Sequence, residues 1–500
     1  MTVTAVAMLA VLPASAQSKQ PAPPPQDVAR YILPPGNYGG LPTTNESLDQ
    51  LPLYDALTPL RGNVSATDIQ QNFLPENFEP VGATQEIDTG RPGVRVLYDE
   101  YGVAHVYGRT REDVAFGAGW VTARDRMLLL QLGRFPARVA VADVPGIDAF
   151  SLVTSAQSFV PSAATEALVT QQIDLLIQTY GDKGRQIIAD AQAEADGVNA
   201  YAAANNIDLT PPVTVNDVIA VTAFIGSIFG AGGGGEARNA DLLAKLRQGL
   251  GVQRGDAAWD DAMLFDDPEA PTTIRQHFNY GPLTGGPVRG SVVVDANSIV
   301  PLDPRAPASA AASTVDPTAA PPGRQASNFL VVDPKRSATG NTLAVMGPQL
   351  GYYYPEIVQQ IHLVGPGYEA QGAAVPGMAM YILIGRTHDY AWSLTSANHD
   401  VRDVFAEQLC EPDGSAPTRA SDHYLFDGEC RPFVEFDAGL LNGTPLRYPT
   451  SVHGPVIGTA TVQGAPYALT RKRSTFGRDG LNLAALKDMT DGVATTAQKF

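Results

Sequence analysis

One serine in this chain stands where it could act as both nucleophile and base. Ser327 follows a tract rich in Ala, Pro and Ser and directly precedes an apolar strand pattern, "NFLVVD". If the peptide bond before Ser327 were cut, this residue would carry a free α-amine, whose pKa is ordinarily about 7.7–8.0, so the amine is partly neutral near neutral pH. A neutral amine can accept the proton of the adjacent hydroxyl. One residue would then supply both groups that acyl transfer needs.

No competing nucleophile motif is present in the sequence. We find no G-x-S-x-G elbow, no S-x-x-K, no H-E-x-x-H and no Walker loop. The glycines of "GAGGGGE", residues 230–236, follow a helical pattern and not a strand, which argues against a phosphate-binding loop. The plain alternative for Ser327 is an ordinary residue at the start of a strand, in a chain that is never cut there.

The segments on either side of Ser327 differ sharply. Residues 281–326 are rich in Pro, Ala, Ser and Gly and have few groups to pack, which predicts a linker or a removable spacer. After Ser327, short patterns such as "TLAVMG", "MYILIG" and "DVFAEQL" follow one another between turns, which indicates packed sheets. Loss of the spacer would free the new terminus to face a substrate cleft.

The region before the spacer combines strands with helices. "VRVLYDEYGVAHVYG" alternates as two short strands broken at "DEYG", which predicts a hairpin. Residues 111–135 and 160–252 carry apolar residues at helical spacing, and four consecutive glycines break the second of these stretches into helices joined by a loop. Residues 17–85 are rich in Pro, Asn, Gly and Gln and predict an extended lead-in.

Composition limits the class of protein. With 500 residues, 44% of them hydrophobic, the chain can bury a large core as one large or two to three ordinary domains. Its 52 acidic against 34 basic residues give a net charge of −18. This charge argues against nucleic acid and against an anionic membrane as partners, because both would repel the protein.

The N-terminus indicates export. "MTVTAVAMLAVLPASAQ" holds an apolar run too short to cross a bilayer, followed by the cleavage pattern Ala14-Ser15-Ala16, so residues 1–16 are predicted to be a signal peptide. The alternative is a disordered apolar tail, since no Lys or Arg precedes the run. We expect a secreted or periplasmic protein without a membrane span. In that location Cys410 and Cys430, which flank a polar loop, are expected to form a disulfide, with two free thiols as the alternative.

Several stretches, in the same order along the chain, resemble the penicillin acylases, a family of N-terminal nucleophile hydrolases. The resemblance is dense from Ser327, in "SNFLVVDPKRSATGNTLAVMGPQLG", to about Glu407. It also covers "GVRVLYDEYGVAHVYGRTREDVAFGAGWVTARDRMLLLQLGR" and, more weakly, "FIGSIFGAGGGGEARNADLL", "DDPEAPTTI" and "SVHGPV".

The resemblance implies a fold and a maturation pathway. The fold class is α+β, the four-layer αββα sandwich of N-terminal nucleophile hydrolases with a helical α-chain portion. Residues 86–280 correspond to the α-chain, 281–326 to the spacer and 327–500 to the start of the β-chain. The resemblance implies autocatalytic cleavage before Ser327, a second cut near 281–290 and a heterodimer of the protein's own α and β chains.

Three catalytic positions are carried over from the family. Ser327 matches the nucleophile, preceded by Ala326 where many members have Gly. Gln349, in "GPQLG", matches a position whose backbone carbonyl helps to hold the α-amine. Ser396, in "LTSANHD", matches a position whose backbone N–H is one oxyanion donor.

A structural calcium site is also carried over. Asp400 and Asp403, in "HDVRDVF", align with two calcium-binding aspartates, Arg402 with a position that contributes its carbonyl, and Glu236 with a glutamate of the α-chain. Hard oxygen ligands suit Ca²⁺. The alternative is that no ion binds and that these residues are two solvated aspartates and a loop glutamate.

The sequence departs from the family in two respects. The second oxyanion donor, an asparagine, is expected beyond Phe500, and the helical pattern that reaches Phe500 without a terminating residue also predicts that the chain is a fragment of a precursor. Aromatic positions of the acyl pocket correspond to Leu350 and Ile384, and Ile228 and Phe229 take the place of its helical lining. Fewer flat aromatic walls favour an aliphatic or looser acyl group.

We therefore expect an exported amidohydrolase that cleaves the linear amide of a small-molecule N-acyl compound, such as a β-lactam side chain, through an acyl-enzyme. An acylase for N-acyl homoserine lactones or lipopeptides is the alternative among enzymes. A non-catalytic, uncleaved binding protein with the same fold is the alternative from another class.

Overall fold

The structure is a computed structural model of the 500-residue chain. It describes residues 65–74, 76–230, 232–263, 290–305, 326–349, 356–395, 399–496 and 498–499, without the side chains of 71–72, 326–328 and 347–349. The predicted signal peptide and most of the predicted lead-in lie outside these ranges. The described residues divide into two units, one formed by residues 65–74 and 330–345 and the other by the rest.

The smaller unit contains a short helix and parts of a strand pair. Helix α3 (Ala66–Asn72) begins with a capping box in which Ser65 and Asp68 bond to each other's backbone N–H. Strands β7 (Ala326–Val332) and β8 (Leu343–Gln349) form a two-stranded sheet that extends beyond this unit at both strands, with the 3₁₀ helix η3 (Pro334–Arg336) between them. Ser327 is the second residue of β7.

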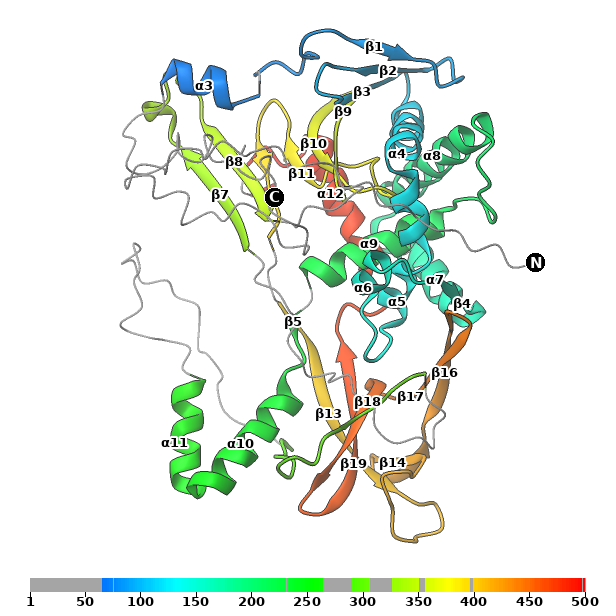
Figure 1. Ribbon diagram of the computed structural model, residues 1–500, viewed down its shortest axis with the longest axis vertical. Coiled ribbons are helices and arrows are strands. Elements are labelled where there is room, and N and C mark those ends of the chain that lie inside the picture. The colour runs from blue at the N-terminus through cyan, green and yellow to red at the C-terminus, as the bar shows by residue number, and fades with distance from the viewer. Residues whose placement is uncertain are drawn as a thin grey trace, which may run out of the picture. The chain divides into compact units, whose positions relative to one another are not determined.

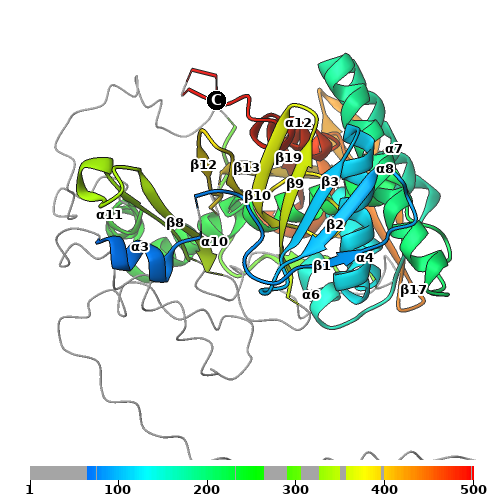
Figure 2. The same cartoon turned by 90° about the horizontal axis from the view of Figure 1, so that it is seen from above.

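The larger unit holds a seven-stranded sheet built from both sides of Ser327 (Figure 2). Its strand order is β1 (Gln85–Ile87), β2 (Val94–Tyr98), β3 (Ala104–Gly108), β9 (Gln359–Gly365), β10 (Tyr368–Ala374), β11 (Ile384–Arg386) and β12 (Ala391–Trp392). The predicted hairpin is the antiparallel pair β2–β3, in which Val96 lies opposite Val106. Strand β3 then pairs in parallel with β9, so segments some 250 residues apart lie side by side.

Helices pack against this sheet and form the main core with it (Figure 1). The helices of this region are α4 (Arg111–Arg134), α5 (Ala137–Ala142), α6 (Ala149–Thr154), α7 (Ala163–Tyr180), α8 (Asp182–Ala204), α9 (Val215–Phe229) and α12 (Leu483–Thr490). Helices α4 and α8 cross closely because Gly119 and Gly197 carry no side chain there. A Cβ atom at Gly119 would lie 2.0 Å from the carbonyl oxygen of Glu194, and one at Gly197 would lie 2.0 Å from that of Phe116.

A second sheet has ten strands. Its main path is β15 (Glu429–Pro432), β14 (His423–Phe426), β13 (Asp400–Cys410), β19 (Ala465–Arg473), β18 (Gly454–Val462), β17 (Thr444–Ser451), β16 (Val434–Leu441) and β4 (Phe159–Pro161). Strand β5 (Gly232–Gly233) pairs with β13, and β6 (Val300–Pro301) pairs with β18. The predicted disulfide is present and joins Cys410 in β13 to Cys430 in β15.

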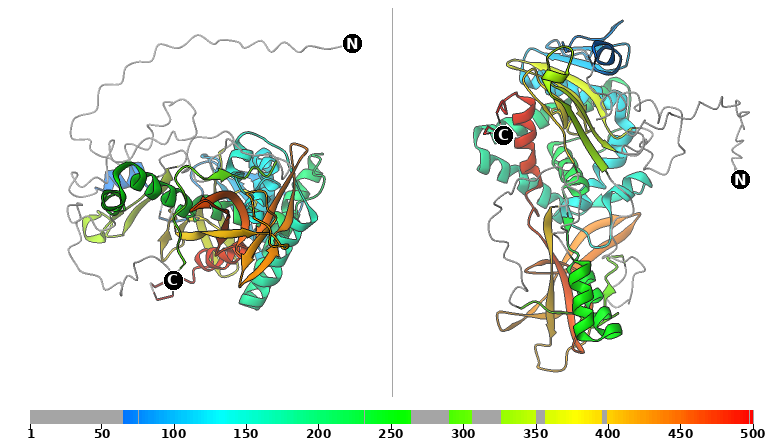
Figure 3. Two further views of the ribbon diagram at one scale, coloured as in Figure 1. Left: turned by 90° about the horizontal axis from the view of Figure 1, so that it is seen from below. Right: turned by 90° about the vertical axis from the view of Figure 1, so that its left-hand side faces the viewer.

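Helices α10 (Glu236–Leu250) and α11 (Val252–Ala262) follow β5 as a pair of consecutive helices, drawn in green in Figure 3. They meet at Gly251, whose φ of +79° suits glycine. The predicted helical stretch 160–252 is thus confirmed as α7 to α10, with the glycine run as the break between α9 and α10.

Two details differ from the expectations. The C-terminal helical pattern ends at Thr490, because Gly492 adopts a φ of +75° and its N–H bonds to the carbonyl of Met489. Residues 290–305, inside the stretch expected to have few packing groups, pair and pack with the ten-stranded sheet. Across the described ranges, no helix combines the length and the apolar character needed to span a bilayer.

Candidate functional site

The predicted nucleophile and one predicted partner lie on neighbouring strands. Ser327 is in β7, and Gln349 is the last residue of β8, the strand with which β7 pairs. The side chains of both residues lie outside the described part of the structure, as does the whole of Ser396, which falls between β12 and β13. The catalytic roles of these three residues therefore stay predictions.

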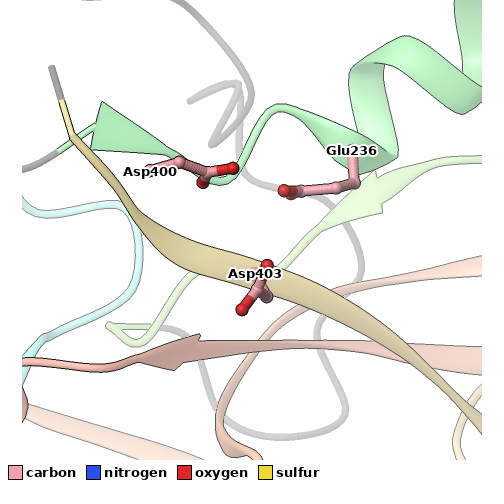
Figure 4. A group of neighbouring side chains, drawn as sticks. All are labelled: Glu236, Asp400 and Asp403. Carbon is pink, nitrogen blue, oxygen red and sulfur yellow. The ribbon is translucent and has the colours of Figure 1, made fainter. Parts of the chain in front are cut away.

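The four predicted metal-site residues converge from two elements. Glu236 is the first residue of α10, and Asp400, Arg402 and Asp403 lie at the start of β13. One carboxylate oxygen from each of Glu236, Asp400 and Asp403 lies within 4.8 Å of the others. Figure 4 shows the carboxylates of Glu236 and Asp400 turned toward each other, with Asp403 further along the strand that carries Asp400.

The glycine run makes this convergence possible. Gly233 has a φ of +79°, and a Cβ atom on it would lie 2.0 Å from Oδ1 of Asp400 and 2.6 Å from the carbonyl oxygen of Arg402. The N–H of Gly232 donates to the carbonyl of His399 at 2.8 Å, and that of Gly234 donates to the carbonyl of Arg402 at 2.7 Å. The run is therefore a short strand, β5, that brings Glu236 against β13.

An irregularity in the pairing places both aspartates near the same point. Residues 400 and 403 of a regular strand would face opposite sides, because side chains alternate. The register between β5 and β13 shifts between Asp400 and Arg402. This shift disturbs the alternation where Asp400 approaches Asp403, a detail that no sequence pattern indicated.

The cluster has the electrostatics of a cation site. Burial, followed by the charges of Asp400 and Asp403, raises the pKa of the Glu236 carboxyl. Oε2 of Glu236 is buried and has no hydrogen-bond partner in the part of the chain that the structure describes. The carbonyl oxygen of Arg402, which already accepts from Gly234, keeps a second lone pair. Carboxylate and carbonyl oxygens of this kind fit Ca²⁺ or another hard divalent cation.

A buried ion network lies beside the cluster and was not predicted. Arg471 Nη2 donates to Asp143 Oδ1 at 2.9 Å, and Arg473 Nη1 donates to Asp479 Oδ1 at 2.5 Å. Burial would raise the pKa of Asp143, but Arg471, Arg473 and Arg402 outweigh it and hold this pKa below its usual value. The sequence feature that could have indicated this network is the run "TRKR", residues 470–473, because its strand pattern puts two arginines on one face.

The predicted acyl-pocket residues are only partly described. Ile384 is the first residue of β11 and is buried in the main core, while Ile228 and Phe229 end α9 and are partly buried. Leu350 lies outside the described residues. A groove lined by Arg134, Arg138 and ten other residues contains none of these four positions.

Comparison with known proteins defines the class to which this fold and site belong. The family model described as penicillin amidase matches residues 93–497, well over half of the chain. The chain therefore belongs to the penicillin amidase family, and its helices and sheets confirm the predicted α+β fold class.

The individual relatives share only low sequence identity with this chain. Penicillin G acylase from Escherichia coli is 24% identical over 79% of this chain and 48% of its own length. Penicillin acylase 2 proenzyme from Pseudomonas sp. (strain SE83) is 25% identical over 87% of this chain and 52% of its own length. Acyl-homoserine lactone acylase QuiP from Pseudomonas fluorescens (strain Pf0-1) is 30% identical over 34% of this chain and 20% of its own length. The chain spans about half the length of the two penicillin acylases named here.

Proposed function

We propose that this protein is an amidohydrolase that cleaves the linear amide bond of an N-acyl small molecule through an acyl-enzyme on Ser327. The observation that carries this proposal is the family match over residues 93–497, which includes Ser327 and both flanking regions. The relatives named as penicillin acylases and as an acyl-homoserine lactone acylase support an N-acyl substrate.

The proposed mechanism starts with cleavage of the peptide bond between Ala326 and Ser327. The free α-amine of Ser327 then accepts the hydroxyl proton while Oγ attacks the substrate carbonyl. The amine returns this proton to the leaving nitrogen, and the acyl group stays on Oγ as an ester. Water, deprotonated by the same α-amine, hydrolyses the ester and releases the acid.

Two further residues have proposed roles in this reaction. The backbone carbonyl of Gln349 would accept a hydrogen bond from the α-amine and so orient its lone pair. The backbone N–H of Ser396 would donate to the oxyanion of the tetrahedral intermediate. A pre-oriented donor of this kind contributes on the order of 3 kcal/mol to the transition state.

Maturation into two chains and export are parts of the same proposal. The word "proenzyme" in the name of the Pseudomonas sp. relative supports processing. The pattern of residues 1–16 supports a signal peptide, and the Cys410–Cys430 disulfide fits an oxidising location such as the periplasm or the cell exterior.

We further propose that Glu236, Asp400 and Asp403 hold a structural Ca²⁺ ion together with the carbonyl of Arg402. The unpartnered Oε2 of Glu236 and the close approach of three carboxylates support this assignment. The ion would offset the mutual repulsion of these carboxylates. It would also join α10, from the α-chain region, to β13, from the β-chain region.

The acyl specificity has two candidates. The two penicillin acylases named above match 79% and 87% of the chain, whereas acyl-homoserine lactone acylase QuiP matches 34% of it at 30% identity. Replacement of aromatic pocket positions by Leu350 and Ile384 favours an aliphatic acyl group, so an aliphatic N-acyl homoserine lactone is the second candidate substrate.

The test uses the full-length gene product and its Ser327→Ala variant. We expect the parent to give two chains on a denaturing gel, with Ser327 as a new N-terminus, and to hydrolyse either a phenylacetyl anilide or an aliphatic acyl homoserine lactone. The variant should remain one chain without activity. A single persistent chain in both proteins, equally inactive on both substrates, would favour the non-catalytic binding protein instead.

A further inference from the structure

Residues 290–305 form part of the ten-stranded sheet although they lie inside the stretch that the sequence predicts to be a spacer. Strand β6 pairs antiparallel with β18, with Val300 opposite Thr459 and Pro301 opposite Gly458. Gly458 permits this approach, because a Cβ atom on it would lie 2.6 Å from the carbonyl oxygen of Val300. The missing side chain at Gly458 therefore lets the backbone of residues 300–301 lie directly against β18.

The N-terminal half of the segment caps the turn between β18 and β19. The Asp295 carboxylate accepts hydrogen bonds from the N–H groups of Gln463 and Gly464, both at 2.9 Å. The N–H of Asp295 donates to the carbonyl of Thr461 at 2.8 Å. The two residues of this turn have positive φ, +50° for Gln463 and +81° for Gly464, and Asp295 satisfies the N–H groups that this conformation turns away from the strands.

The middle and end of the segment are bonded to three other strands or loops. Ser298 Oγ accepts from the N–H of Thr461 at 3.1 Å, and the carbonyl of Ser298 accepts from Arg419 Nη2 at 2.8 Å. The N–H of Leu302 donates to the carbonyl of Ile457 at 3.0 Å. The last of these contacts, from the N–H of Arg447 to the carbonyl of Pro304 at 3.1 Å, lies one residue before Arg305.

The segment also completes a small hydrophobic core. Val294 is 3% exposed and packs in a cluster with Ile457, Ala460, Leu469 and, from helix α10, Ala237. Removal of residues 290–305 would uncover this cluster and leave the N–H groups of the β18–β19 turn without partners. Contacts of this number and burial are typical of a permanent part of a fold and are not expected of a linker that is removed.

We propose that residues 290–305 stay in the mature protein, as a retained strand of the α-chain, and that the removable spacer begins only after Arg305. This inference rests on the proposed cleavage before Ser327 and shortens the spacer from residues 281–326 to the part beyond 305. The second cut is then the hydrolysis of a peptide bond C-terminal to Arg305, with one water consumed. A protease needs an exposed, locally unfolded strand, whereas residues 294–304 are held by strand pairing and hydrogen bonds.

The first experiment follows the natural maturation of the full-length protein. The mature protein is purified under native conditions, denatured, and its chains are identified by intact mass and peptide mapping. We expect Ser327 as one N-terminus and an α-chain that ends at or after Arg305. A mature protein with Ser327 as N-terminus but without residues 290–305 would overturn the inference while leaving the proposed function intact.

The second experiment decides the inference even if the chain is never cut before Ser327. The Ser327→Ala precursor is treated briefly with trypsin, which can cut after Arg289, Arg305 and Arg324, and is then passed over a gel-filtration column. We expect the peptide that contains residues 290–305 to elute with the body of the protein under native conditions. Its separation from the body without denaturant would contradict the inference.

A matched pair of variants tests the contacts themselves. Asp295→Ala removes two acceptors from the β18–β19 turn, whereas Asp303→Ala removes a carboxylate that bonds to Arg305 within the same segment. Because no Lys or Arg lies between Arg289 and Arg305, an elastase-type protease replaces trypsin here. We expect its cleavage within residues 290–305 to be roughly tenfold faster in Asp295→Ala, since two hydrogen bonds hold the segment closed there. The rate in Asp303→Ala should match the parent, and equal rates in both variants would count against the proposal.

Discussion

Glu236 shows how a single residue depends on groups far from it in the sequence. Its carboxylate is partly buried beside two aspartates that lie more than 160 positions later, and burial and these charges raise its pKa. A bound divalent cation would lower the pKa of Glu236 again, because its positive charge favours the ionised carboxylates. A measurement of thermal stability with and without calcium therefore tests the proposed calcium site directly.

For Glu236→Gln we predict that calcium no longer stabilises the protein. A ligand that binds only the folded state adds about 2.7 kcal/mol when its concentration is 100 times Kd, so the parent should melt several degrees higher in calcium than in EDTA. Differential scanning calorimetry of the parent, of Glu236→Gln and of a control, Glu429→Gln, measures this difference. Glu429 is an exposed residue of β15, in the sheet that also holds Asp400 and Asp403, and its variant should respond as the parent does. No calcium effect on the parent would refute the site.

A buried histidine pair gives a pH dependence at the residue scale. Nδ1 of His105 lies 2.9 Å from Nδ1 of His362, and both rings are almost fully buried. Nε2 of His362 faces Oε1 of Glu369 at 3.1 Å, and Nε2 of His105 faces Asp99 at 3.4 Å. Burial, followed by the neighbouring His105, lowers the pKa of His362 to about 4, and burial also lowers the pKa of His105.

These shifts predict that acid destabilises the folded protein. The unfolded His362 binds its proton near pH 6.5, whereas the folded His362 binds it only near pH 4. The unfolded state therefore holds more protons between these values, and the free energy of unfolding falls with falling pH by on the order of 1.4 kcal/mol for each pH unit. Urea unfolding from pH 7 to pH 4 should show a shallower pH dependence for His362→Gln than for the parent. The same slope in His362→Gln, in the parent and in a His423→Gln control would contradict this role.

At the scale of elements, the close crossing of α4 and α8 is the feature most sensitive to substitution. The two glycines at the crossing let the helix backbones touch, so that α8 can also present Glu194 to the N–H groups of Ala379 and Met380 at 2.8 and 3.1 Å. Burial raises the pKa of this carboxyl to about 7, against the two backbone hydrogen bonds, which lower it.

Gly197→Ala is predicted to destabilise the protein although alanine is the better helix former. The new Cβ would lie 2.0 Å from the carbonyl of Phe116, and overpacking of this kind typically costs about 1–3 kcal/mol. Gly133→Ala, in α4, is the matched control, since a Cβ there has nothing within 4 Å. Its free energy of unfolding should stay within about 1 kcal/mol of the parent value or rise slightly. Urea unfolding of both variants measures the contrast, and equal stabilities would show that the helices can separate at little cost.

At the scale of the whole molecule, segments before and after Ser327 are interleaved. Strands β3, β4, β5 and β6 come from the region before Ser327, and each pairs with a strand that follows it: β9, β16, β13 and β18, respectively. The ion pairs of Arg111 with Asp491 and of Arg471 with Asp143 also cross this point. A cut before Ser327 would therefore not release either part.

We predict that the two chains of the cleaved protein stay together until the protein is denatured. Native gel filtration should give one species that contains both chains, and denaturant should separate them. Reducing agent alone should not, because Cys410 and Cys430 both follow Ser327 and cannot join the chains. Separate elution of the chains under native conditions would mean that the shared strands contribute little to their association.

Patterns between near neighbours in the chain were sufficient to predict much of this protein. The hairpin β2–β3, the helices on both sides of the glycine run and the Cys410–Cys430 disulfide follow from residue type and spacing along the chain. The role of Ser327 rests mainly on the family resemblance and stays a prediction. Such local features are encoded by the backbone preferences and the burial pattern of a few consecutive residues.

Contacts between distant segments could not be predicted in this way. The sequence does not indicate that β3 joins β9, that His105 faces His362 across 257 positions, or that residues 290–305 enter the ten-stranded sheet. The sequence also does not indicate that the side chain of Asp400 lies so close to Gly233 that no Cβ atom would fit at this position. The strand pairings satisfy backbone hydrogen bonds, and the side-chain contacts form, only once distant segments of the chain have come together, so the tertiary packing selects them from many local alternatives.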